Sequence, residues 1–377
     1  MPMKLLSVAA LLSVAALWSV VVLPAVAADA PARALDFKVD PSWPKVPLPN
    51  KWAIGELGGI YVDAQDNVWI VNRPGTLVGY EKAAMANPPG SVCCVPAPPV
   101  IAFDPAGNII QAWGGPGQGY DWPSTEHGIH VDPNGNVWVG GSSTRGNEKE
   151  PADGMVLKFT RDGKFLMQIG RPGQAPKKSL DETQVWGAAD MAVDPATNEV
   201  FVADGYGNRR VAVFDADTGK FKRAWGAYGK PPTDNDIGRY KPGEPRATQF
   251  RNVHCIELSR DGLVYVCDRD NNRMQVFKKD GSFVSEHVYR PETHNGAGTV
   301  GNISFSADNS LIALADIGNY IVRLVRRDKP DVIVHEFGTY GNYAGQLNRM
   351  HQAAFDSKGN IFTAEAAGRR VQKFVRQ

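Results

Sequence analysis

One short unit recurs along this chain, and it restricts the fold more than any other feature of the sequence. Each copy contains an apolar segment, an Asp-x-x-Gly/Asn turn, a second apolar segment, an Asp/Asn-Arg step, a Val/Met-x-x-Phe segment and a last segment that ends in glycine. The copies begin with Gly-Ile-Tyr-Val-Asp (59–63), Gly-Ile-His-Val-Asp (128–132), Asp-Met-Ala-Val-Asp (190–194), Cys-Ile-Glu-Leu-Ser (255–259), Asn-Ile-Ser-Phe-Ser (302–306) and Gln-Ala-Ala-Phe-Asp (352–356). Short apolar strands with turn residues every 8–12 positions are typical of all-β structure.

Four strands per copy and a period of roughly 40–60 residues predict an all-β, six-bladed β-propeller with four antiparallel strands per blade. No linker separates the copies, so residues 35–377 should form one domain. The last copy ends at Gln377 after three strands, and we expect Leu35–Val39 to supply the missing outer strand. Long Gly- and Pro-rich insertions at 74–100, 142–154, 171–185 and 227–248 are expected to be loops around the channel mouth.

The repeat resembles NHL repeats, and two stretches carry the resemblance. They are Asp204-Gly-Tyr-Gly-Asn-Arg-Arg-Val211 and Asp268-Arg-Asp-Asn-Asn-Arg-Met274. The similarity extends over nearly all of the chain after its first residues, and it implies the same six-bladed propeller.

The first 27 residues are predicted to be a secretory signal peptide. Lys4 precedes an apolar run from Leu5 to Val22, and Ala25-Val26-Ala27 supplies a small-x-small cleavage pattern. The alternative is a transmembrane anchor, which the marginal length of the run and Pro24 disfavour. We therefore expect a secreted or periplasmic protein with no membrane span after cleavage.

Charge and cysteine content limit the partners and the compartment. The 41 basic side chains nearly balance the 40 acidic ones, which argues against a nucleic-acid partner. An exported chain can form disulfides. Cys255 and Cys267 flank a turn and would face each other on antiparallel strands, where a disulfide is expected and two buried thiols are the alternative. For the adjacent Cys93 and Cys94, a vicinal disulfide and two free thiols both remain open.

Histidine alternates with small residues at one position of the repeat. The residue five before the end of each first-strand motif is, in order, Gly58, His127, Ala189, His254, Gly301 and His351. First strands line the channel of a propeller, and alternate blades of six are about 120° apart, so three imidazoles should converge at one level. Three histidine ligands suit a divalent ion, most simply Zn²⁺. The small residues between them are expected to leave room for a ligand.

At these positions the sequence resembles the peptidyl-α-hydroxyglycine α-amidating lyase family. Those enzymes are six-bladed propellers that split a carbinolamide into a primary amide and glyoxylate. The resemblance implies a zinc site at His127, His254 and His351. It also places a catalytic tyrosine at Tyr206, within Asp-Gly-Tyr-Gly-Asn, and active-site arginines at Arg73 and Arg269.

These residue types suit that chemistry. A divalent metal makes a hydroxyl proton easier to remove, a tyrosine can accept it as a general base, and arginine can hold a carboxylate through two hydrogen bonds. The alternative for Arg269 and Arg73 is a packing role, because NHL repeats often place an arginine after the second strand. His130 lies three residues after His127 and is expected to be structural, and His287, His294 and His335 are expected at the surface.

The sequence departs from the family at a second metal site. The family has an aspartate after the third histidine, which binds calcium together with two main-chain carbonyls. The matching positions here are Gln352 and the carbonyls of Ile60 and Ile129. A neutral amide predicts weak or absent Ca²⁺ binding.

The leading hypothesis is a metal-dependent C–N lyase that acts on a small-molecule or peptide substrate. The alternatives are a metal-dependent hydrolase such as a lactonase, and a non-enzymatic NHL module whose insertion loops bind a protein or another partner. A bound metal separates the enzymes from the module, and glyoxylate release separates the lyase from the hydrolase.

Overall fold

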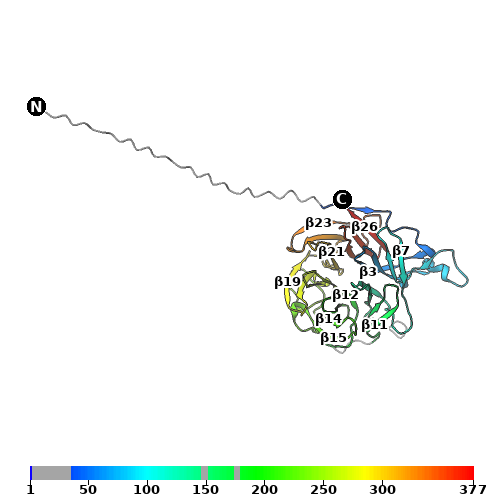
Figure 1. Ribbon diagram of the computed structural model, residues 1–377, viewed down its shortest axis with the longest axis horizontal. Helices are drawn as coiled ribbons and strands as arrows, with labels where there is room; N and C mark the ends of the chain where they lie inside the picture. The colour runs from blue at the N-terminus through cyan, green and yellow to red at the C-terminus, as the bar shows by residue number, and fades with distance from the viewer. Residues whose placement is uncertain (2–34, 146–151, 174–178) are drawn as a thin grey trace. The chain divides into compact units, whose positions relative to one another are not determined.

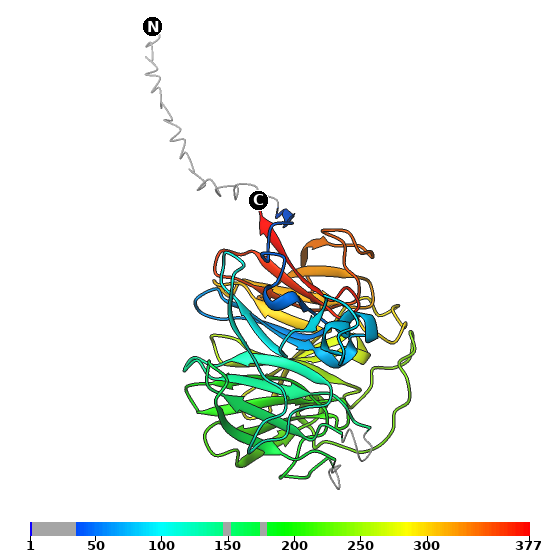
Figure 2. The ribbon, with the colours of Figure 1, turned by 90° about the vertical axis from the view of Figure 1, so that its right-hand side faces the viewer.

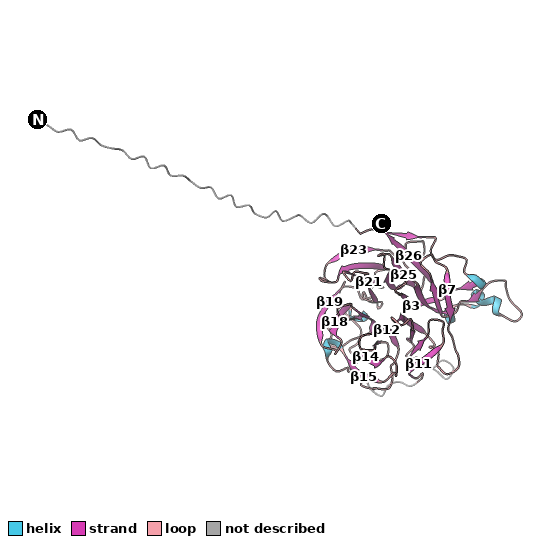
Figure 3. Ribbon diagram, in the orientation of Figure 1, coloured by secondary structure: helices cyan, strands magenta, loops and turns pink. Residues whose placement is uncertain are grey.

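The computed structural model describes residues 35–145, 152–173 and 179–377, together with Met1. Residues 35–377 form one compact unit of four-stranded antiparallel sheets arranged around a centre, as Figure 1 shows. Strands account for nearly all the regular structure in Figure 3, and short helical turns lie in the loops. The prediction of a six-bladed, all-β propeller is confirmed. The proposed signal peptide lies almost wholly outside the described residues. In the described part of the chain, no helix has the length and apolar character needed to span a bilayer.

Every blade is built in the same order from the axis outward. The innermost strands are β3 (Glu56–Val62), β8 (Glu126–Val131), β12 (Ala188–Asp194), β16 (Val253–Leu258), β20 (Asn302–Phe305) and β24 (Met350–Phe355). The second strands are β4 (Val68–Arg73), β9 (Val137–Gly141), β13 (Glu199–Asp204), β17 (Leu263–Asp268), β21 (Leu311–Asp316) and β25 (Ile361–Glu365). Each innermost strand contacts the innermost strands of both neighbouring blades, so the six form a closed inner ring.

The third strands are β6 (Val100–Phe103), β10 (Met155–Phe159), β14 (Arg210–Asp215), β18 (Arg273–Lys278), β22 (Ile321–Arg326) and β26 (Arg370–Arg376). The outer strands are β7 (Ile109–Trp113), β11 (Phe165–Gly170), β15 (Phe221–Trp225), β19 (Phe283–Val288), β23 (Ile333–Phe337) and, from the start of the chain, β1 (Phe37–Asp40). Smaller elements lie in the loops: the parallel pair β2 (Trp52–Ala53) and β5 (Val95–Pro96), and the 3₁₀ turns η1 (Pro49–Lys51), η2 (Pro74–Thr76), η3 (Gly79–Met85), η4 (Ala227–Gly229) and η5 (Arg269–Asn271).

Strand β1 closes the ring by pairing with β26, as the sequence predicts. Phe37 lies opposite Arg376, and Val39 lies opposite Phe374. Figure 2 shows the start of this unit beside its C-terminal strand. The two ends of the propeller are therefore joined within one sheet, so that strand pairing closes the ring.

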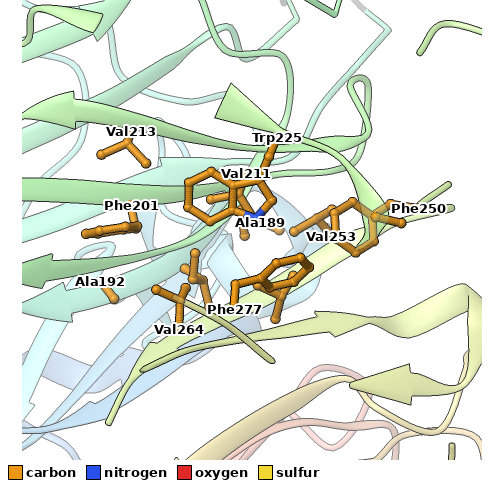
Figure 4. Packing of buried hydrophobic residues seen from close by; sticks show 14 residues of the cluster. Ala189, Ala192, Phe201, Val211, Val213, Trp225, Phe250, Val253, Val264 and Phe277 are labelled. Carbon is orange, nitrogen blue, oxygen red and sulfur yellow. The ribbon is translucent and has the colours of Figure 1, made fainter. Parts of the chain in front are cut away.

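The core lies between blades, where the apolar faces of neighbouring sheets meet. Figure 4 shows one such cluster, in which Phe201 and Val213 of one blade pack near Val264 and Phe277 of the next, with Trp225 beside them. Alternation along each strand supplies these faces, because successive side chains point to opposite sides of a sheet.

The aspartates and arginines of the repeat have structural partners. Asp63 and Asp132 accept hydrogen bonds from the Trp69 and Trp138 indoles at 2.9 and 3.1 Å. The arginine near the start of the third strand forms an ion pair with the acidic residue that ends the second strand. These pairs are Arg210–Asp204, Arg273–Asp268, Arg323–Asp316 and Arg370–Glu365. These four arginines have a packing role within their blades.

All four cysteines are paired. Cys255 is bonded to Cys267 across β16 and β17, as expected from their positions, and Cys93 is bonded to Cys94 in the loop between η3 and β5. Cys93 and Cys94 therefore form the vicinal disulfide and not two free thiols, the two alternatives that the sequence leaves open.

His130 has the structural place predicted for it. Its Nε2 accepts a hydrogen bond from the Val193 N–H at 3.3 Å, and its ring packs edge-on against Tyr61. His287 and His335 lie on the outer strands β19 and β23 and are half-buried there. His287 pairs with Asp331, and His335 packs against Phe37. His294 is exposed, as predicted.

Closure by β1 can be tested with Val39→Asp. The new carboxylate would lie against the apolar cluster that includes Phe374, so we expect the free energy of unfolding to fall by about 2 kcal/mol. Lys38→Asp is the matched control, since Lys38 points to solvent on the same strand. Equal stability of the two variants in urea denaturation would contradict this role for β1.

Burial of His130 should make stability depend on pH. Burial lowers its pKa from 6.5 to about 4, against a smaller opposing effect of Asp132. In the unfolded chain this histidine is protonated below about pH 6.5, whereas in the folded chain it stays neutral down to about pH 4. The free energy of unfolding therefore decreases as the pH falls between these two values. We expect the wild type to lose about 3 kcal/mol more than His130→Gln from pH 7 to pH 4. Parallel pH profiles in denaturant titrations would show that His130 is not responsible.

Candidate metal centre

His127, His254 and His351 meet on the propeller axis. Each lies on the innermost strand of its blade, and each is buried. The ring centroids are 5.0 Å apart for His127–His254, 4.6 Å for His127–His351 and 5.0 Å for His254–His351. One ligand nitrogen from each ring lies within 4.8 Å of the others. The convergence that the alternating pattern predicts is therefore present.

A local irregularity at the start of the inner strands accompanies this convergence. Pairing with the second strand shifts register next to the repeat position in β3, β8, β12, β16 and β24. A β-bulge of this kind leaves one residue out of the ladder and redirects its side chain. In β16 and β24 the residue left out is the histidine itself, His254 or His351.

The carbonyl of the next blade sets the orientation of two of the imidazoles. Nδ1 of His127 lies 2.6 Å from the Ala189 carbonyl oxygen, and Nδ1 of His254 lies 2.6 Å from that of Gly301. Because a carbonyl only accepts, each Nδ1 carries the proton and each Nε2 presents a lone pair. A carbonyl that fixes the tautomer in this way is a common outer-shell partner of metal-binding histidines.

The third imidazole, His351, also has a carbonyl of the next blade as its neighbour, but the two do not form a hydrogen bond. The Gly58 carbonyl acts on the pKa of His351, but Nδ1 of His351 is buried and has no hydrogen-bond partner among the described residues. Across the three pairs, the small residue of one blade faces the histidine of the blade before it.

The small residues Gly58 and Gly301 do not leave open space for a ligand, as we expected, because other atoms lie close to them. A Cβ added to Gly58 would lie 2.3 Å from the Glu126 carbonyl oxygen, and one added to Gly301 would lie 2.3 Å from Cδ1 of Ile317. These positions are small because neighbouring groups approach them closely. The sequence showed the alternation, but it gave no direct sign of the carbonyl contacts.

Burial keeps the three imidazoles neutral. It lowers the pKa of each well below 6.5, and nearby positive charge acts in the same direction. For His351 that charge comes from Arg73, then Arg269 and Arg349. Neutral imidazoles are the form that binds a metal ion.

Tyr206 lies between two of the histidines. Its hydroxyl is 2.9 Å from Nε2 of His127 and 3.0 Å from Nε2 of His254. Both nitrogens are acceptors, whereas the phenol has one proton to donate. Two lone pairs thus face a single phenol proton, and a divalent cation held by the three imidazoles would accept the lone pair that this proton leaves unpaired. The donor set fits a metal ion such as zinc.

The turn that carries Tyr206 is held from both sides. The Tyr206 N–H donates to the Gly187 carbonyl at 3.2 Å, and the Gly207 N–H donates to that of Trp186 at 2.9 Å. Gly205 lies so close to Val253 that an added Cβ would be 2.2 Å from the Val253 carbonyl oxygen. These contacts fix the phenol over the centre.

The two predicted arginines border the same centre. Nη1 of Arg269 donates to the Tyr206 hydroxyl at 3.2 Å, while its Nε donates to Asp270 at 2.8 Å. Burial disfavours the Arg269 cation, but Tyr206 and Asp270 outweigh that effect and raise its pKa. Nε of Arg73 donates to the Glu126 carbonyl at 2.7 Å, directly before His127, and Nη1 lies 3.4 Å from the Glu56 carboxylate.

Two charged residues near the centre were missed by the sequence analysis. Arg349 is exposed, lies two residues before His351, and lowers the pKa of that histidine. Burial raises the pKa of Glu126 to about 7, against a hydrogen bond from the Trp122 indole that lowers it. Only their positions next to the histidines in the sequence could have drawn attention to them.

The second proposed metal site does not fit calcium. Oε1 of Gln352 accepts the Ile60 N–H at 2.8 Å, and Nε2 is buried without a hydrogen-bond partner among the described residues. The amide thus bridges the first and last blades directly, and Gln352 with the carbonyls of Ile60 and Ile129 offers no negative charge.

Comparisons with known proteins agree with this fold. The NHL repeat family model matches residues 250–277. Peptidyl-glycine alpha-amidating monooxygenase B of Xenopus laevis is 30% identical over 256 residues, which are 66% of this chain and 25% of that protein. Peptidyl-alpha-hydroxyglycine alpha-amidating lyase 1 of Drosophila melanogaster is 26% identical over 73% of this chain and 48% of its own length. The chain thus spans between a quarter and a half of these two relatives.

Two further matches cover most of both chains. NHL repeat-containing protein 3 of Homo sapiens is 24% identical over 90% of this chain and 84% of its own. A solved streptogramin B lyase superposes with a TM-score of 0.52 at 14% identity, over 91% of this chain and 98% of that one, which supports the fold alone. The chain is therefore a six-bladed β-propeller with an NHL repeat, homologous to the amidating monooxygenases and hydroxyglycine amidating lyases.

Proposed function

We propose that the protein is a metal-dependent carbon–nitrogen lyase that splits an N-acyl-α-hydroxyglycine into a primary amide and glyoxylate. The observation that carries the proposal is Tyr206, whose hydroxyl lies within 3.0 Å of Nε2 of both His127 and His254, two of the three converging histidines, and 3.2 Å from Arg269. The homology to amidating lyases and monooxygenases supports the same reaction class.

The reaction needs one proton to move and one bond to break. The hydroxyl of the substrate loses its proton, the carbon–oxygen bond becomes a carbonyl, and the electrons of the C–N bond pass to the amide nitrogen, which takes up a proton. A divalent metal held by His127, His254 and His351 would supply Lewis acidity toward the substrate hydroxyl.

The residues of the chain supply the remaining functions. Tyr206 is placed to accept the hydroxyl proton as general base, and it can return a proton to the departing amide nitrogen. Arg269 stabilises negative charge on the phenol oxygen through its 3.2 Å contact. Arg73, whose Nε contacts the Glu126 carbonyl directly before His127, provides a cation for the carboxylate that becomes part of glyoxylate. The buried position of the imidazoles keeps water away from their ring nitrogens.

The paired cysteines agree with an oxidising environment. We propose that the protein acts outside the cytoplasm, in the periplasm or after secretion, on a peptide or small-molecule substrate.

The proposal predicts glyoxylate release from an N-acyl-α-hydroxyglycine peptide without charged side chains by the metal-loaded protein. Tyr206→Phe should lower kcat by about 10²–10⁴-fold, because the general base is removed. Metal content should be unchanged, since three nitrogen ligands remain. Tyr343→Phe is the matched control, because Tyr343 is exposed, and it should retain full activity.

Other outcomes would favour other functions. Lactone hydrolysis without glyoxylate release would indicate a metal-dependent hydrolase on the same centre. Absence of both activities in the metal-loaded protein would indicate a non-enzymatic binding module. Full lyase activity in Tyr206→Phe would exclude the tyrosine as the base and overturn the mechanism.

A further inference from the structure

A cavity of about 610 Å³ lies among the loops of the third, fourth and fifth blades. Its lining includes Arg209, Arg239, Arg251, Tyr240 and Asp270, and residues 237–240 come from one of the long insertions. None of these residues takes part in the proton transfer or bond cleavage proposed for Tyr206.

The cavity shares a wall with the histidine centre. Asp270 lines the cavity, and its carboxylate receives a hydrogen bond from Nε of Arg269, whose Nη1 donates to the Tyr206 hydroxyl. Arg209 follows Tyr206 by three residues in the same turn region. A substrate that reacts at Tyr206 therefore has this cavity as a neighbouring space for its non-reacting part.

The positive charge of the cavity is poorly compensated. Nε of Arg251 donates to the Asn271 amide oxygen at 2.6 Å, and its Nη1 donates to the carbonyls of Ile237 and Gly238. These neutral partners hold the guanidinium in place without cancelling its charge. Arg239 is exposed and has no hydrogen-bond or ion-pair partner among the residues that the structure describes.

The available carboxylates do not balance these arginines. Asp270 is already paired with Arg269, and Asp236 lies 3.5 Å from Arg209 with its side chain 86% exposed. An ion pair so exposed contributes little. Three guanidinium groups around one cavity thus favour an anionic ligand, since arginine binds carboxylates through paired hydrogen bonds.

We propose that this cavity binds the acyl part of the substrate and selects acyl groups that carry carboxylates, such as peptides with acidic side chains next to the reacting unit. The inference rests on the proposed function for the identity of the reacting unit. The charge preference itself belongs to the cavity and can be measured without turnover.

The test compares two non-reacting peptides by calorimetry at low ionic strength. Acetyl-Glu-Glu-amide should bind the wild-type protein about tenfold more tightly than acetyl-Gln-Gln-amide, and added salt should reduce the difference. Arg239→Gln, at an exposed and unpaired residue, should lose part of the preference, and the double variant Arg209→Gln/Arg239→Gln should lose most of it. Arg260→Gln is the matched control, because Arg260 is also exposed but lines a different cavity, and it should keep the preference.

Several results would overturn the inference. They are equal binding of the two peptides to the wild type, no binding of either, or an unchanged preference in the double variant. If only the proposed function fails, the protein will release no glyoxylate but will still bind the acidic peptide more tightly.

Discussion

The contact between each channel histidine and the backbone of the next blade is the interaction on which the centre depends. Nδ1 of His127 and of His254 each lie 2.6 Å from a carbonyl oxygen of the following blade, which leaves Nε2 directed to the axis. Such contacts require the inner strands to approach closely, and the closed ring of six blades brings them together. Closure by β1 and orientation of the imidazoles are therefore parts of one constraint.

Arginines at different positions of the repeat have different partners. Arginines near the start of the third strand, such as Arg210 and Arg273, are buried against the aspartate that ends the second strand. Arg73 and Arg269 lie at or directly after the end of a second strand, and they border the histidine centre instead. A difference of a few residues in the repeat thus decides whether an arginine pairs with the aspartate of its own blade or borders the histidine centre.

Much of this architecture was predictable from the sequence, because the number and spacing of the repeats indicate the number of blades and their symmetry. Six copies with alternating apolar strands gave the blades, and the position of histidine within each copy gave the convergence on the axis. The role of Gly58 and Gly301 could not be read in this way, since it depends on how closely neighbouring blades approach. The cavity around Arg239 and Arg251 was also hidden, because it joins an insertion loop to blades that are distant in sequence.

Metal content tests the central claim most directly. The purified protein should contain about one zinc or similar divalent ion per chain, and a variant with His127, His254 and His351 changed to glutamine should contain none while remaining folded. A second variant with His287, His294 and His335 changed to glutamine should retain the ion. Absence of metal from the wild type after incubation with zinc, or equal retention by both variants, would contradict the assignment of the axial histidines as a metal centre.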